Sequence, residues 1–152
     1  MKKIITHPSV TAHNPTILLV TPPPINELHL EEEDLKKGYS AVTRHQTVSA
    51  TYANVIRDIV EEFMDPKVLL VDLWVAMMIE ARRLNPNAFP AMLGSKESGS
   101  SAELRTLLSD GIHLTGDGYA VFLREVMRLV GTKVEDGHAD AAPWTFPQVP
   151  LI

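Results

Sequence analysis

The chain contains no cysteine. That absence excludes a disulfide framework, a thiolate nucleophile and a metal site built on sulfur. The apolar runs are also short, well below the roughly 18 residues of a membrane-spanning helix, and the opening segment MKKIITHPSV lacks the hydrophobic core of a signal peptide. We therefore expect no membrane span, and the cytoplasm is the default compartment.

Positive charge is in the minority as well. The chain carries 14 Lys and Arg against 19 Asp and Glu, for a net charge of -5. Proteins whose main partner is a nucleic acid usually present a basic patch, so we expect no nucleic-acid partner. A length of 152 residues with 45% hydrophobic residues is typical of one soluble domain. We expect an α/β portion over residues 1–130 and an irregular tail, residues 131–152, packed over a surface.

Two short apolar segments predict buried strands. TILLVT occupies residues 16–21 and KVLLVDL residues 67–73, and such runs are typical of parallel strands covered on both faces. Between them, residues 44–63 carry apolar side chains at spacings of three and four, which predicts an amphipathic helix. Strand, helix and strand in this order form a βαβ unit. The helical stripe comprises Val48, Tyr52, Val55, Ile56, Ile59, Val60 and Phe63.

Further helices are expected downstream. They cover residues 74–84, residues 102–108, and a segment that follows the N-cap candidate Thr115 and has Asp117 in its first turn. The face of this last helix comprises Tyr119, Phe122, Leu123, Val126, Met127 and Val130. The acidic stretch over residues 25–40 predicts a solvated loop or a short exposed helix. Met77 and Met78 are expected in the core.

The expected sheet is too small for a complete α/β domain. Two strands with three to four helices leave the strand at residues 16–21 with an unpaired edge, and a two-stranded sheet is rarely stable by itself. Self-association through this edge is one consequence. The prolines that follow, Pro22 to Pro24, have two interpretations: they end the strand, which we favour, or they wall a substrate pocket.

Asp110 and His113 lie three residues apart in the turn DGIH, directly before the last helix. An Asp at this spacing can hold a His in one tautomer and stabilise the imidazolium that forms when the His accepts a nucleophile's proton. The same spacing suits an ordinary turn, in which the carboxylate caps backbone amides and the His is merely exposed. The position after the last strand favours the catalytic interpretation, because active groups gather at the carboxyl ends of parallel strands.

The block DGIHLTGDGY resembles the final conserved block of the SGNH, or GDSL-type, hydrolases, which supplies the catalytic Asp and His. The segments ILLVTPPPINE, RHQTVSATYANV and VLLVDLW are similar to the isoamyl acetate-hydrolysing esterase branch of that family. This resemblance covers about residues 17–130. It implies a three-layer α/β/α, flavodoxin-like fold with a five-stranded parallel sheet, and hydrolysis of a small carboxylic ester through an acyl-enzyme. It implies no cofactor, and it makes Asp110 and His113 the catalytic residues.

The nucleophile of that family is missing. The chain contains neither Gly-Asp-Ser nor Gly-x-Asn-Asp, and its first strand corresponds by resemblance to the family's fourth. We therefore expect a partial domain over residues 1–152, equivalent to the carboxyl-terminal portion of such an esterase and inactive alone. The alternatives are a non-catalytic pseudoenzyme or interaction module that pairs with another chain and, less favoured, a flavodoxin-like ligand-binding domain.

No other residue type provides a clear site. None of the serines sits at a strand-to-helix elbow, where a hydroxyl would be presented above a sheet; they are Ser9, Ser40, Ser49, Ser95, Ser98, Ser100, Ser101 and Ser109. The remaining histidines lack the spacing that places two imidazoles on one helical face; they are His7, His13, His29, His45 and His138. We expect no metal site.

Overall fold

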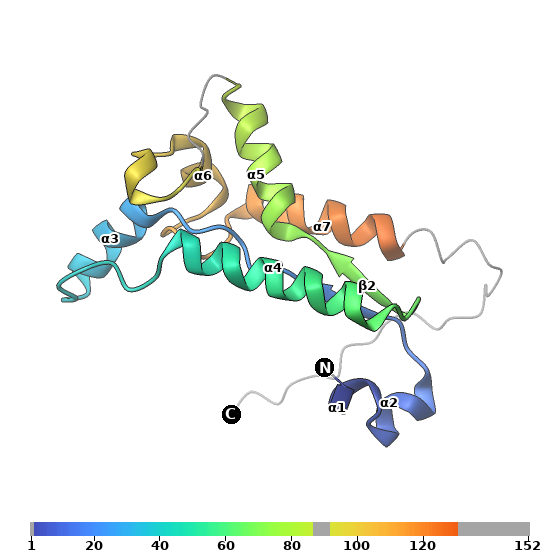
Figure 1. The fold of residues 1–152 in the computed structure, drawn as a ribbon. Coiled ribbons are helices and arrows are strands. Elements are labelled where there is room, and N and C mark those ends of the chain that lie inside the picture. The colour runs from blue at the N-terminus through green and yellow to red at the C-terminus, as the bar shows by residue number, and fades with distance from the viewer. Residues whose placement is uncertain (1, 87–91, 131–152) are drawn as a thin grey trace, which may run out of the picture.

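The computed structural model describes residues 2–86 and 92–130, so the packing expected for the tail lies outside the described residues. The elements follow one another in a mixed α/β order (Figure 1). They are α1 (Lys2–Ile5), α2 (Pro8–His13), β1 (Ile17–Val20), α3 (Glu27–Lys36), α4 (Gln46–Phe63), β2 (Val68–Val71), α5 (Leu73–Leu84), the 3-10 helix η1 (Lys96–Ser98), α6 (Ala102–Leu107) and α7 (Gly116–Val130).

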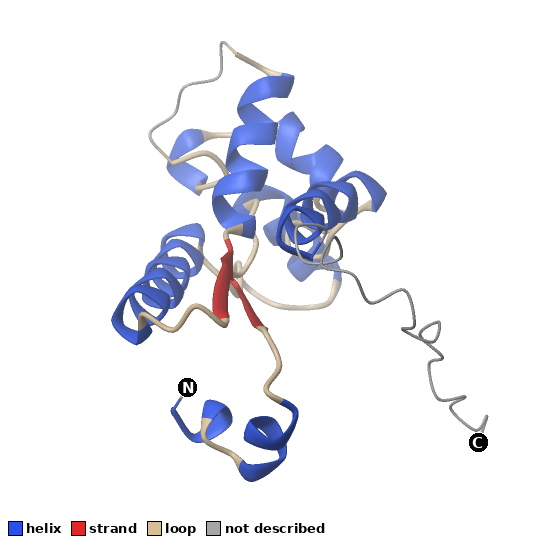
Figure 2. Ribbon diagram, turned by 90° about the vertical axis from the view of Figure 1, so that its right-hand side faces the viewer, coloured by secondary structure: helices blue, strands red, loops and turns tan. Residues whose placement is uncertain are grey.

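The two strands form the parallel pair that the sequence predicts. Ile17 pairs with Val68, and the register continues to Val20 and Val71. Figure 2 shows α4 and α7 on opposite sides of this pair, in the order helix, sheet, helix, with α1 and α2 apart from them near the amino terminus. The βαβ unit is thus confirmed. The number of helices is larger than expected, because α1, α2 and α3 add to the four downstream ones.

Strand β1 is not buried on both faces, contrary to the expectation from its apolar run. Ile17, Leu18 and Leu19 are only half-buried, and Val20 is 37% exposed. The amide of Ile17 donates to the carbonyl oxygen of Lys67, and the amide of Thr21 donates to that of Val71. Because successive amides of a strand point to opposite edges, those of Leu18 and Val20 point away from β2. Among the described residues only β2 pairs with β1, which leaves that edge open.

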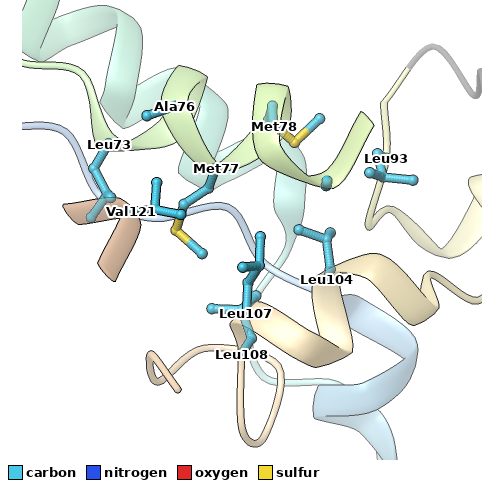
Figure 3. Packing of buried hydrophobic residues seen from close by; sticks show 10 residues of the cluster. Leu73, Ala76, Met77, Met78, Leu93, Leu104, Leu107, Leu108 and Val121 are labelled. Atoms are coloured by element: carbon cyan, nitrogen blue, oxygen red, sulfur yellow. The ribbon is translucent and has the colours of Figure 1, made fainter. Parts of the chain in front are cut away.

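The main hydrophobic core lies among the helices rather than on the sheet. Met77 and Met78 of α5 pack against Leu104 and Leu107 of α6 and Val121 of α7 (Figure 3). Met77 is fully buried and Met78 is 4% exposed, which confirms the prediction that both methionines pack in the core. This cluster fixes α7 relative to α5 and therefore positions the loop that precedes α7.

Both predicted helical faces are only partly correct. The half-buried members of the two stripes are Ile56, Ile59, Val60 and Phe63 in α4 and Phe122 and Val126 in α7. In α4 the buried residues are Gln46, Ser49 and Ala53, whereas Val48 and Tyr52 of the apolar stripe are exposed. Gln46 and Ser49 face inward because loop groups hydrogen-bond to their side chains.

The buried face of α7 has a different cause. Gly118 and Val121 are its buried residues, because only a glycine permits so close an approach: a Cβ at Gly118 would lie 2.3 Å from the carbonyl oxygen of Leu107. An apolar set of this helix consequently faces outward, namely Tyr119, Leu123, Met127 and Val130.

The acidic stretch also differs from its prediction. It forms a helix, α3, that is not simply exposed: Glu27, His29, Leu30 and Asp34 are buried. Leu30 is fully buried against the rest of the chain. Within the described residues, no helix combines the length and the apolar character needed to cross a membrane.

Candidate functional site

Asp110 and His113 lie in a tight loop between α6 and α7. An antiparallel bridge between Leu108 and Leu114 closes the loop, and the amide of Ser109 donates to the carbonyl oxygen of His113 over 2.8 Å. This small closed loop needs a backbone with left-handed φ at its tip, which Gly111 supplies with φ +92°. The local sequence therefore brings the two side chains of the predicted pair together.

Asp110 performs both of the tasks that its spacing allows. Its Oδ1 accepts hydrogen bonds from the amides of Ile112 and His113, over 3.2 and 2.9 Å. Its Oδ2 lies 2.7 Å from Nδ1 of His113. One carboxylate thus caps the turn and holds the imidazole.

The charge state of Asp110 determines the proton position on His113. Burial raises the pKa of this carboxyl, but the amide and imidazole of His113 and the amide of Ile112 outweigh burial and lower the pKa to about 2. At neutral pH an ionised carboxylate only accepts hydrogen bonds. Nδ1 of His113 must therefore carry the shared proton, so in the neutral imidazole the lone pair is on Nε2. Nε2 has no partner among the residues that the structure describes, and the side chain is 74% exposed.

The loop is held against the start of α3. The amide of Asn26 donates to the carbonyl oxygen of Gly111 over 2.9 Å, and the side-chain Nδ2 of Asn26 donates to the carbonyl oxygen of Ser101 over 3.0 Å. Asn26 is 1% exposed. A buried residue two positions after the proline segment thus connects this segment to the start of α6 and to the His113 loop.

His113 lies at the wall of an apolar pocket of about 550 Å³, a volume within the usual range for small-molecule sites. The pocket is lined by Pro22, Pro23, Ile25, Thr43, Arg44, His45, Val48, Ser49, Tyr52, Ile112 and His113. The proline segment therefore does wall a pocket as well as end β1. Val48 and Tyr52, two exposed members of the α4 stripe, form part of the apolar wall.

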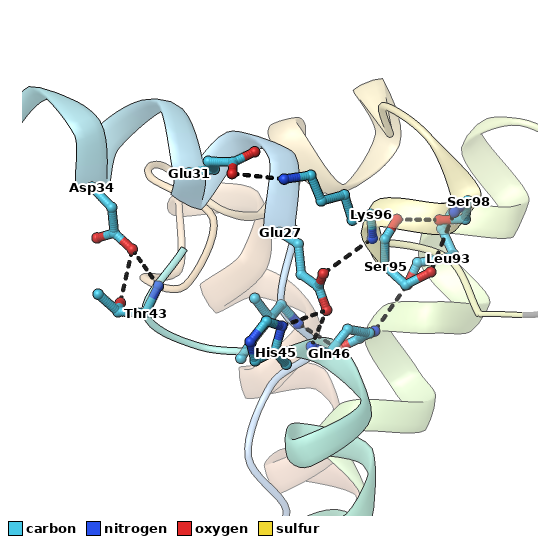
Figure 4. Close-up of polar contacts among 11 residues, drawn as sticks. Glu27, Glu31, Asp34, Thr43, His45, Gln46, Leu93, Ser95, Lys96 and Ser98 are labelled. Carbon is cyan, nitrogen blue, oxygen red and sulfur yellow. Dashed lines mark hydrogen bonds and ion pairs between the residues drawn. The ribbon is translucent and has the colours of Figure 1, made fainter. Parts of the chain in front are cut away.

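The wall that carries Arg44 is anchored at both ends by buried polar groups (Figure 4). Asp34 accepts from the amide and the hydroxyl of Thr43, each over 2.8 Å. Gln46 is fully buried; its amide donates to Glu27 over 2.7 Å, its Oε1 accepts from the amide of Ile25, and its Nε2 donates to the carbonyl oxygen of Leu93.

The roles of Glu27, Asp34 and Gln46 could not be predicted from the sequence. Glu27 and Asp34 lie in a stretch whose acidic composition is typical of a solvated segment. The only local signal for Gln46 is its position at the start of the α4 pattern. The partners of these residues come from distant parts of the chain, as in the bond between Gln46 and Leu93.

No serine of the described residues is bonded to the imidazole of His113. Ser49 lines the pocket, but its buried hydroxyl donates to the carbonyl oxygen of Pro23 over 2.7 Å. Ser95 and Ser101 cap helices, and the hydroxyl of Ser109 donates to the carbonyl oxygen of His113. These serines have structural partners, which agrees with the absence of a nucleophile elbow from the sequence.

A second polar cluster lies at the carboxyl ends of the strands. Asp72, directly after β2, receives both Nε and Nη2 of Arg57, over 2.7 and 2.9 Å, and the hydroxyl of Thr21 over 3.2 Å. Burial raises the pKa of Asp72, but the hydrogen bonds from Arg57 and from the amide of Val75 lower it by more. The pKa of Asp72 is therefore below its usual value. The hydrogen bond to Asp72 raises the pKa of Arg57. Every one of these contacts is internal, so the cluster serves the fold.

Comparison with known proteins adds no family to this geometry. No family model matches the chain, and a search of curated proteins found no match. Among residues 2–86 and 92–130, no group of three or more His, Asp or Glu side chains converges so as to hold a metal ion.

Proposed function

We propose that Asp110 and His113 are the acid and base of a serine ester hydrolase of the SGNH type, and that the nucleophilic serine comes from residues outside this chain. The observation that carries the proposal is the 2.7 Å contact between Asp110 Oδ2 and His113 Nδ1 beside the apolar pocket. A carboxylate that fixes one ring nitrogen leaves the other nitrogen to act as base.

The chemistry follows from this orientation. Nε2 of His113 accepts the proton of a serine hydroxyl as the oxygen attacks the ester carbonyl, and the imidazolium formed is stabilised by the negative charge of Asp110. The same proton then passes from Nε2 to the leaving alkoxide, and an alcohol departs. Water repeats the sequence on the acyl-enzyme and releases the acid. The apolar pocket, walled by Pro23, Val48 and Ile112, suits the acyl or alkyl group of a small ester.

The isolated chain should not catalyse this reaction. It has no Gly-Asp-Ser or Gly-x-Asn-Asp block, and without a nucleophile and oxyanion donors only weak residual catalysis is expected. We expect the purified chain to hydrolyse p-nitrophenyl butyrate no faster than free imidazole does. Rapid hydrolysis that His113→Ala abolishes would contradict the assignment of the serine to another segment.

The decisive experiment extends the chain. The coding sequence upstream of Met1, read in frame, should encode the two missing blocks, and the longer protein should hydrolyse short acyl esters. There, His113→Ala should lower kcat by about 10³-fold or more. Absence of both blocks upstream, or full activity of the His113→Ala variant, would overturn the proposal.

A test of the dyad is possible on the present chain. Nitrogen-15 NMR of His113 should report the proton on Nδ1 in the neutral form, whereas Asp110→Asn should return the ring to the tautomer with the proton on Nε2. His7, an exposed histidine near the amino terminus whose Nδ1 accepts a hydrogen bond from the amide of Ser9, serves as the internal reference with its proton on Nε2. A His113 ring that already carries its proton on Nε2 at neutral pH would contradict a base at that nitrogen.

The open edge of β1 favours a second candidate, a module that associates with a second copy of itself. The amides of Leu18 and Val20 point away from β2, and such an edge accepts an added strand. Light scattering after size exclusion should then show a dimer that Val20→Lys disrupts. The matched control is Leu35→Lys, an exposed apolar residue on α3, away from the sheet (Figure 1). A monomer at all concentrations excludes this candidate.

A further inference from the structure

Two hollows of different character meet at His113. The apolar pocket described above shares Thr43, Arg44, Ile112 and His113 with a smaller hollow of about 330 Å³. The smaller hollow is also lined by Asp34, Lys37 and Tyr39. One apolar compartment therefore continues into a polar one, with Arg44 at the junction.

The charged groups of the smaller hollow differ in whether they can bind a ligand. The carboxylate of Asp34 is buried and already accepts two hydrogen bonds from Thr43. Lys37 and Arg44 are exposed, and neither side chain has a hydrogen-bond or ion-pair partner within residues 2–86 and 92–130. The two free cations thus face the hollow while its one anion is turned toward the backbone.

The position of Arg44 is built into the fold. Thr43 on one side is held by Asp34, and Gln46 on the other is held by Glu27, Ile25 and Leu93 (Figure 4). The backbone that carries the guanidinium is consequently fixed before any ligand arrives, which lowers the entropic cost of binding.

We infer that the joined hollows bind an amphiphilic monocarboxylate, with its chain in the apolar pocket and its carboxylate on Arg44. A guanidinium fork matches the two oxygens of a carboxylate, and Lys37 adds a second positive charge nearby. The walls formed by Pro22, Val48 and Tyr52 accommodate a hydrocarbon chain. This site goes beyond the proposed hydrolysis, since it requires no serine and no ester.

The test uses the purified chain and octanoate as the probe. Calorimetric titration should give saturable one-site binding of octanoate, at least about tenfold tighter than that of 1-octanol, which lacks the charge, or of acetate, which lacks the chain. Chemical-shift changes should map to Ile25, Val48 and Ile112. Equal affinity for octanol, or tighter binding of octyl phosphate than of octanoate, would overturn carboxylate recognition.

Matched variants locate the head group. Arg44→Gln should weaken octanoate binding about tenfold and leave octanol binding unchanged. Arg82→Gln removes the same charge from an exposed residue of α5 that lines neither hollow, so it should alter affinity less than twofold. If both substitutions weaken octanoate binding equally, the affinity depends on the net charge of the protein and not on Arg44, and the proposed site is overturned.

The failure of this inference is distinguishable from failure of the proposed dyad. Asp110 lines neither hollow, so Asp110→Asn should change the His113 tautomer while octanoate binding is retained. An unchanged tautomer with intact octanoate binding counts against the dyad alone. A changed tautomer with no octanoate binding by the wild type counts against the carboxylate site alone.

Discussion

A side chain at Gly111 would collide with Leu30: its Cβ would lie 2.6 Å from the backbone nitrogen of Leu30 and 2.7 Å from the carbonyl oxygen of Asn26. Both neighbours are backbone atoms, which cannot move aside as a flexible side chain could. The loop that carries Asp110 and His113 therefore rests directly on the first turns of α3. A single glycine connects the candidate catalytic pair to a helix about eighty residues earlier in the sequence.

The first prediction concerns this contact. Gly111→Ala should lower the free energy of unfolding by about 2 kcal/mol or more, because it adds a backbone clash to the strain of a positive φ. Urea unfolding measures the loss. Gly38→Ala is the matched control, since Gly38 has a φ of +90° but no atom within 4 Å of its Cβ position; it should cost only about 1 kcal/mol. Equal losses for the two variants would show that the contact with α3 contributes nothing.

The second prediction concerns acid stability. The folded protein lowers the pKa of Asp110 from 3.8 to about 2, with hydrogen bonds from His113 outweighing the opposing effect of burial. A depressed pKa stabilises the fold above the unfolded value, and this contribution is lost as the pH falls from 3.8 through 2. The carboxylate is partly open to solvent, so we expect about 1 to 2 kcal/mol rather than the full shift.

The measurement compares urea unfolding of the wild type and Asp110→Asn at pH 6 and pH 3. The stability difference should be largest at pH 6 and should shrink at pH 3, where the unfolded carboxyl is protonated. Glu61→Gln, an exposed substitution on α4, should stay within about 0.5 kcal/mol of the wild type at both pH values. A difference for Asp110→Asn that does not change with pH would contradict the hydrogen-bonded carboxylate.

The third prediction concerns the cluster after the strands. Asp72 joins Arg57, Thr21 and the amide of Val75, and it is about three-quarters buried. Asp72→Ala should lower the free energy of unfolding by about 2 to 4 kcal/mol, because it leaves a partly buried guanidinium unpaired and removes the cap of α5. Lys36→Ala breaks an exposed pair with Glu33 and should cost less than about 0.5 kcal/mol. Comparable losses would show that Asp72 is no more than a surface charge.

The strands and the Asp110–His113 pair could be predicted because their signals are local. TILLVT is closed by three prolines, and KVLLVDL is bounded by charge, so their ends are marked in the sequence. Asp110 and His113 are three residues apart in one turn, and the structure places their side chains 2.7 Å apart. No distant segment is needed to form either feature.

The most buried face of each helix could not be predicted, because it depends on contacts between segments far apart. The buried face of α4 contains Gln46 and Ser49, and their partners Ile25 and Pro23 lie more than twenty residues away. The buried face of α7 is set by the close approach of Gly118 to Leu107. A pattern of apolar spacing identifies a helix but does not identify which polar group finds a buried partner.

The last prediction concerns Gln46, which connects the fold to the pocket wall. Its side chain is fully buried and satisfies the amide of Ile25 and the carbonyl oxygen of Leu93, over 2.7 and 2.9 Å. Gln46→Leu keeps a similar size but leaves both backbone groups without this partner, and each such loss costs about 1 to 3 kcal/mol. We therefore expect the free energy of unfolding, measured in urea, to fall by about 2 to 4 kcal/mol, whereas that of Thr47→Ala, an exposed neighbour, should stay within about 0.5 kcal/mol of the wild type.

Gln46→Leu should also weaken octanoate binding where the variant is folded, because the backbone at Arg44 then loses one of its two anchors. A folded Gln46→Leu variant with wild-type stability and wild-type octanoate affinity would show that Arg44 is positioned by other groups.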